Sequence, residues 1–293
     1  MINNNIKNLS GKLVVYSLAA VTLFSCNSGS SDKAKETTDS IPTAEKKVEK
    51  KPNLFYALPS PIQLGLLLQK AGATYNKNTL NPLSNITTYT SPNSKALNLG
   101  IYGADLSYAA VFNQSQDTKL YLNSSKKLAD ELGINNSFSA DMMKRMDKNE
   151  GVKDSTLQII SEVFLNANES LKANKQGDIS LEVIAGGFIE GLYIGVSSAK
   201  TAKDKEVIYK RIAELKGPLA NLVLLLSKEE NAGVNSIIDD LKSILAIYGE
   251  SPAASADITA SADTTKKILT IGGGKSNSTL SKEQIEKITA HER

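Results

Sequence analysis

A helical hydrophobic period through most of the chain is the feature that most limits its fold. From residue 54 to about residue 248, apolar side chains recur at the three- and four-residue spacing of one helix face. Strand signals are scarce, and residues 86–90 form the one Thr-rich patch in this region. The sequence therefore predicts an all-α domain over residues 54–250, either a multi-helix bundle or stacked helical hairpins.

Turn and capping residues divide this region into separate helices. Gly72 and Gly133 follow periodic segments and are expected to end them, while Asp154 is expected to cap a long helix. A short helix that carries three methionines follows Ser139. The other expected helices cover about residues 61–71, 92–112, 116–132, 180–198, 203–215, 218–226 and 233–248. Because most connections are short, neighbouring helices should pack antiparallel; a helical repeat array stays open as an alternative.

Two of the expected helical stretches are apolar nearly all round. They are residues 101–112, which contain Asp105, and residues 183–196, which contain Glu190. In the second stretch Gly187, Gly191 and Gly195 are four residues apart and so share one helix face. A smooth face of this kind predicts the close approach of another backbone. The stretch of residues 183–196 is too short to span a membrane.

Two interpretations of the acids in these stretches are open. In the first, two central helices pack tightly through small residues, with Asp105 and Glu190 at the edges or bonded to tyrosines. In the second, Asp105, Tyr108, Glu190 and Tyr193 converge on a ligand in an internal cavity. Either arrangement requires a hydrogen-bond donor or a raised pKa, because a buried carboxylate without a partner is unfavourable.

Several kinds of chemistry are unsupported by the residue inventory. His291 is the only histidine, which argues against a Ser-His-acid triad and against a histidine metal site. Tryptophan is absent and aromatic residues are sparse, which argues against a sugar-stacking surface. We therefore expect no metal, no cofactor and no enzymatic activity. A hydrolase that uses the carboxylates of Asp105 and Glu190 is kept as an alternative.

The first residues have the layout of a secretory signal. Residues 1–12 are polar and carry two cations, Lys7 and Lys12, with no acid. A mostly apolar run of residues 13–24 follows; as a helix it would rise only about 18 Å, which is too short to span a bilayer well. This layout matches the charged and apolar regions of a signal peptide, which we place at residues 1–25.

The end of the apolar run indicates how the signal is processed. Cys26, the only cysteine in the chain, follows Leu23, Phe24 and Ser25. The sequence Leu23-Phe24-Ser25-Cys26 resembles the lipobox of bacterial lipoproteins. The Asn- and Lys-rich composition without tryptophan resembles that of Bacteroidota proteins. The lipobox resemblance implies that the Cys26 thiol is diacylated, that the chain is cut before Cys26, and that two or three acyl chains then hold the protein stably on a membrane.

Polar segments flank the expected helical domain. Residues 26–53 contain almost no large apolar side chain and predict a flexible tether with a reach of roughly 25–30 Å. Residues 251–293 are a low-complexity tail; we expect disorder over 252–265 and a short helix over 281–290, capped by Ser281 and Gln284. Loss of Lys7 and Lys12 with the signal would lower the formal charge from +3 to +1, so nucleic acid is not an expected partner.

The sequence thus predicts a lipid-anchored protein of the cell envelope. Asn27 after the acylated cysteine favours transport to the outer membrane, by resemblance to lipoprotein sorting rules. The expected partners are the membrane, through lipid on Cys26, and another envelope protein bound by the helical domain. A carrier or sensor of a small apolar ligand is the first alternative, and the carboxylate hydrolase is the second.

Overall fold

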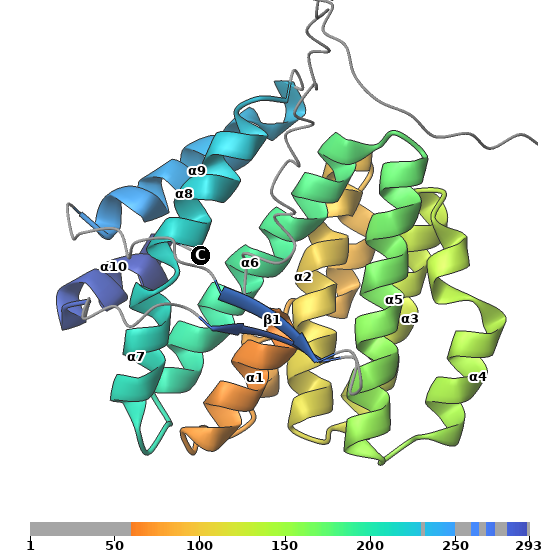
Figure 1. Cartoon of the computed structure of the whole chain (residues 1–293), viewed down its shortest axis with the longest axis horizontal. Coiled ribbons are helices and arrows are strands. Elements are labelled where there is room, and N and C mark those ends of the chain that lie inside the picture. Colours follow the sequence, from red (N-terminus) through yellow and green to blue (C-terminus); the bar gives the residue numbers. More distant parts are fainter. Residues whose placement is uncertain (1–59, 230–231, 250–258, 264–267, 273–279, 292–293) are drawn as a thin grey trace, which may run out of the picture. The chain divides into compact units, whose positions relative to one another are not determined.

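The computed structural model describes residues 60–229, 232–249, 259–263, 268–272 and 280–291, drawn in colour in Figure 1. Within these residues the fold is all-α apart from one two-stranded hairpin, which confirms the predicted fold class. The helices are α1 (Pro61–Lys70), α2 (Pro92–Val111), α3 (Ser115–Glu131), α4 (Ala140–Lys148), α5 (Lys153–Ala173), α6 (Gly177–Ala199), α7 (Lys205–Ala213), α8 (Lys216–Leu226), α9 (Asn235–Ile247) and α10 (Lys282–His291). The expected signal segment, the lipobox with Cys26 and the tether lie outside the described residues.

Side-chain caps explain where several helices begin. Ser60 accepts a hydrogen bond from the backbone N–H of Gln63, and the Gln63 side chain accepts one from the backbone N–H of Ser60, which makes a capping box at α1. Ser91 starts α2 in the same way, and Ser139 caps α4 through the N–H of Met142. Gly133 ends α3 with a φ of 76°, a conformation that glycine adopts without strain.

The prediction that Asp154 caps the fifth helix is wrong. Helix α5 begins at Lys153 after Val152, which makes no side-chain cap, and Asp154 lies inside the first turn. A carboxylate is favourable there for another reason, because the N-terminal end of a helix carries partial positive charge. Aspartate is therefore favourable both as an N-cap and within the first turn of a helix, and the sequence alone did not show which of these two positions Asp154 occupies.

The C-terminal tail contains structure that the sequence analysis did not predict. Strands β1 (Thr259–Asp263) and β2 (Ile268–Gly272) pair antiparallel, with Ser261 opposite Thr270. Part of the segment expected to be disordered therefore forms a strand. The predicted terminal helix is present as α10, and Ser281 and Gln284 form its capping box through hydrogen bonds of 2.9 and 3.2 Å.

Contacts between helices distant in sequence define the packing. Helices α2 and α6 share the most extensive interface among the described elements, and Figure 1 shows them side by side in yellow and green. Helix α6 also packs against α1, α5, α7, α8 and α10. In a repeat array each unit contacts only its neighbours along the chain, so this pattern indicates a bundle around α6 rather than an array.

Helix α6 is longer than the apolar run that suggested it. Among the described residues it is the one helix whose length and mean hydropathy would suffice to cross a membrane, and 72% of its apolar window is buried inside the protein. A core helix has the same composition, because apolar side chains on every face find protein neighbours there. The interior of the bundle therefore accounts for its apolar character.

Candidate functional site

The interface between α2 and α6 is a contact between two backbones. A β-carbon added at Gly186 would overlap the carbonyl oxygen of Leu97, and one added at Gly100 would overlap the carbonyl oxygen of Val183. Neither position can therefore hold a side chain at this helix separation. Glycine is the residue that lets the two helix axes approach so closely.

The predicted glycine face needs correction in its register. Of Gly187, Gly191 and Gly195, only Gly187 lies against backbone, with an added β-carbon 3.4 Å from the carbonyl oxygen of Gly100. Gly191 and Gly195 instead face side chains, among them Leu64 of α1. The tightest backbone contacts are at Gly186 and Gly100 instead. Gly186 lies one residue before the predicted face of Gly187, Gly191 and Gly195, so α2 crosses α6 one residue away from that face.

Asp105 and Glu190 meet in this interface. Asp105 on α2 has no solvent exposure, and Glu190 on α6 is 8% exposed. Their carboxyl groups are within hydrogen-bonding reach of each other. The backbone N–H of Asn81 donates to Oδ2 of Asp105 at 3.2 Å, whereas Oδ1 of Asp105 and Oε1 of Glu190 have no hydrogen-bond partner in the described part of the chain.

Burial is the main influence on the protonation of this pair. It raises the pKa of the Asp105 carboxyl well above its usual range, and the charge of Glu190 raises it further, while the Asn81 N–H opposes both. Burial likewise raises the pKa of Glu190 to about 7, against the opposing hydrogen bond with Asp105. Each carboxyl therefore favours its protonated form more than a solvated acid does.

The tyrosines around the pair hold the connection between α1 and α2. Tyr121 donates to the carbonyl of Asn81 at 2.8 Å, and Tyr102 donates to the carbonyl of Pro82 at 3.2 Å. Burial raises the pKa of both hydroxyls, and the negative charge of Asp105 contributes to the rise. Asn81 thus joins Asp105 to this tyrosine cluster through its own backbone.

The structure brings together only part of the predicted four-residue site. Tyr108 donates to the carbonyl of Thr74 at 3.2 Å and accepts from the N–H of Asn76 at 3.1 Å, so its hydroxyl serves the same connection. Tyr193 is half-buried and makes no hydrogen bond to either carboxyl among the described residues. Asp105 and Glu190 therefore meet, while Tyr108 and Tyr193 do not join them.

The space near the pair is small. A cavity of about 10 Å³ lies between α1, α2 and α6, lined in part by Leu64, Ala104, Tyr108 and Gly191. That volume holds at most about one water molecule, whereas small-molecule pockets measure roughly 300–1,000 Å³. The described interior between these helices is packed rather than hollow.

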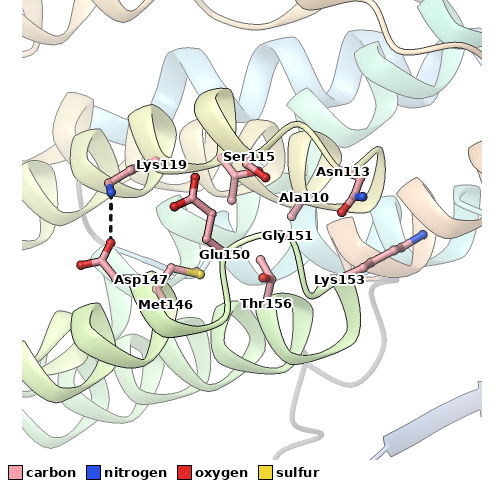
Figure 2. Close-up of a pocket in the computed structure, with 11 residues that line it drawn as sticks. Ala110, Asn113, Ser115, Lys119, Met146, Asp147, Glu150, Gly151, Lys153 and Thr156 are labelled. Carbon is pink, nitrogen blue, oxygen red and sulfur yellow. Dashed lines mark ion pairs between the residues drawn. The ribbon is translucent and has the colours of Figure 1, made fainter.

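A shallow groove on another side of the bundle, which sequence reasoning missed, is shown in Figure 2. Its volume is about 30 Å³, and it lies where α3 and α5 begin and α4 ends. Lys119 pairs with Asp147 across it at 3.1 Å, and this pairing, followed by the charge of Glu150, raises the pKa of Lys119. No sequence motif marks this groove, since its residues come from four separate helices, α2 to α5, and from the segments that connect them.

Two further acids stand out from their surroundings. Asp117 accepts hydrogen bonds from the Tyr75 hydroxyl at 2.8 Å and from Nζ of Lys77 at 2.5 Å. Although desolvation acts to raise the pKa of Asp117, the bonds from Lys77 and Tyr75 lower it. Glu182 on α6 has no solvent exposure and no described hydrogen-bond partner, and burial, followed by the charge of Asp178, raises its pKa to about 7.

No group of three or more metal-binding side chains gathers within the described ranges. Comparison with known proteins gives no family model, no curated protein and no solved structure that matches this chain. The chemistry of the residues themselves is therefore the basis on which a function can be inferred.

Proposed function

We propose that this protein is an envelope lipoprotein, held on the outer membrane by lipid on Cys26, whose helical body binds another envelope protein without catalysing a reaction. The observation that carries the proposal is the sequence Leu23-Phe24-Ser25-Cys26 at the end of a short apolar run. A single cysteine at that position has a specific use as an acylation site, and two or three acyl chains give stable anchoring.

The placement of the acids supports a binding role over a catalytic one. A carboxylate hydrolase needs two acids that a substrate and a water molecule can reach. Asp105 and Glu190 are close together but lie inside the α2–α6 interface, with 0% and 8% exposure. The cavity beside them holds about one water, which gives little support to a carrier of an apolar ligand.

The proposed membrane anchor is tested by replacing the sulfur atom of Cys26, to which the lipid would be attached. Cys26→Ser should abolish incorporation of a labelled fatty acid, leave the precursor uncut, and move the protein out of the membrane fraction after detergent-free washing. Ser28→Ala, which changes a residue outside the lipobox, should behave as the wild type. Equal membrane retention and equal processing of Cys26→Ser would contradict the anchor.

The binding half is tested by crosslinking in intact cells followed by purification under denaturing conditions. We expect one envelope protein to be recovered reproducibly with the wild type and in a smaller amount when Gly186→Ala destabilises the helical body. Recovery of no reproducible partner would contradict a binding role. Protease treatment of intact cells, with permeabilised cells as the control, shows which side of the outer membrane the body occupies.

A further inference from the structure

The carboxyl pair is placed where two helices touch most closely. Asp105 comes from α2 and Glu190 from α6, in the interface where Gly186 lies against the backbone of Leu97 and Gly100 against the backbone of Val183. Neither acid has an ion-pair partner among the described residues. Two ionised carboxylates at this position would repel each other in a medium that screens charge poorly.

We propose that Asp105 and Glu190 hold a proton between them across the α2–α6 interface, and that loss of protons from this pair weakens the bundle as the pH rises. The shared proton makes one carboxyl a hydrogen-bond donor and leaves the other as an acceptor. Each carboxyl thus gains a hydrogen-bond partner in the other, in a pair whose Oδ1 of Asp105 and Oε1 of Glu190 have no partner elsewhere among the described residues. The bond joins the two helices that form the largest interface of the fold.

The surroundings indicate which acid retains the proton. Asp105 has no exposure, so its ionised form is the less favourable of the two, and its Oδ2 already accepts from Asn81. Glu190 keeps a small exposed area and ionises first. At a pH below about 7 both carboxyls are protonated, and above it the arrangement is a protonated Asp105 that donates to an ionised Glu190.

Among the described residues, no positive charge near the pair takes the place of the proton. In the described part of the chain, the groups that shift the pKa of either carboxyl are the other carboxyl and the Asn81 N–H. Tyr102 of α2 and Tyr121 of α3 are the other titratable groups that interact with the pair. Leu64 of α1 lies beside Gly191, next to Glu190 in sequence, and Phe164 of α5 lies beside Gly103, two residues before Asp105.

The sign of the pH effect follows from the raised pKa values. An acid whose pKa is higher in the folded state than in the unfolded chain binds more protons when folded, so stability falls as pH rises. For Glu190 the loss extends from its ordinary value of 4.5 to about 7. Ionisation of Asp105 extends the loss to higher pH.

The test measures the folding equilibrium by chemical denaturation of the full chain in detergent from about pH 5 to about pH 8. Because Glu182 has the same sign of pH dependence, every variant carries Glu182→Gln. We expect this background to lose at least about a thousandfold in its folding equilibrium constant across that range, because Asp105 alone loses about tenfold per pH unit while it stays protonated in the folded state only. Adding Asp105→Asn and Glu190→Gln, whose amides preserve a hydrogen bond between the helices, should reduce the loss to less than about threefold. An equal loss with and without these substitutions would overturn the proposal.

A second measurement does not depend on the amide variant folding. Infrared spectroscopy of the Glu182→Gln protein at about pH 6, where solvated carboxyls are ionised, should show the carbonyl band of a protonated carboxylic acid. The band should vanish when the protein is unfolded at the same pH. Its absence from the folded protein would overturn the shared proton.

Discussion

Glu182 is a single residue whose environment conflicts with its charge. It has no solvent exposure, and both carboxylate oxygens lack a hydrogen-bond partner among the described residues. Because burial raises its pKa to about 7, the folded state is penalised progressively as pH rises from about 4.5 to about 7. We expect Glu182→Gln to raise the free energy of unfolding by about 1–2 kcal/mol above pH 7 and to have little effect below pH 4.5.

Urea denaturation at two pH values checks this prediction. Glu169→Gln on α5, at an exposed position, is the matched control and should leave stability unchanged at both. A Glu182→Gln chain that is less stable than the wild type at high pH would show that the carboxylate has a partner outside the described residues.

The acids differ in how far the sequence could identify them. Asp105 and Glu190 were predictable as candidates because each interrupts a stretch that is otherwise apolar. Their meeting was not predictable, since it depends on the relative rotation of two helices far apart in the chain. Glu182 was missed because it lies at the edge of its apolar stretch, where a helix usually turns polar side chains to solvent.

At the scale of elements, the α2–α6 contact depends on glycine at a few positions. A β-carbon at Gly186 would overlap the Leu97 carbonyl oxygen and lie 2.8 Å from the Leu97 carbonyl carbon, and backbone atoms cannot move aside as a side chain can. We therefore expect Gly186→Ala to lower the free energy of unfolding by about 3 kcal/mol.

Gly177→Ala on the same helix is the control, because nothing lies within 4 Å of its added β-carbon. It should be neutral or stabilise by up to about 1 kcal/mol, since alanine favours helix more than glycine does. Circular dichroism melts of the two variants make the comparison. Equal stability of Gly186→Ala and the wild type would mean that α2 and α6 are farther apart than described.

The packing of helix α10 leads to another prediction. Although α10 lies near the end of the chain, it packs against α9 and α6. Ile288 is fully buried, and Nε2 of Gln284 donates to the carbonyl of Ile247 at 2.8 Å. Ile288→Ala should lower the free energy of unfolding by about 2 kcal/mol through lost burial. Lys287→Ala, at an exposed neighbour, should have little effect in the same denaturation assay, and equal effects of the two would indicate that α10 is not docked.

Helix existence was predictable here and helix partners were not. Capping boxes at Ser60, Ser91 and Ser281 act within four residues, so the local sequence contains the whole signal. The hairpin of β1 and β2 was missed because both segments are short, β1 consists of small and polar residues, and pairing depends on both strands together.

At the scale of the molecule, helix α6 connects elements from every part of the described chain. Its contacts with α1 and α2, with α5, α7 and α8, and with α10 join early, middle and late segments. A bundle arranged in this way cannot lose α6 and keep its remaining contacts, so we expect one cooperative unfolding transition rather than stepwise loss of repeats. The sequence left bundle and array open because only contacts between distant helices distinguish them.

The separation between the anchor and the helical body leads to a last prediction. The chain divides into two units, Met1–Lys50 and Lys51–Arg293, and every helix described here belongs to the second. A fragment of residues 51–293 should therefore unfold at a midpoint within about 2 °C of the full chain, because it retains all contacts of the bundle. Circular dichroism melts in the same detergent buffer measure this, and Gly186→Ala within the fragment should lower the midpoint as it does in the full chain. A midpoint lower by more than about 5 °C in the unsubstituted fragment would show that residues before 51 stabilise the fold, and Cys26→Ser would then alter stability as well as location.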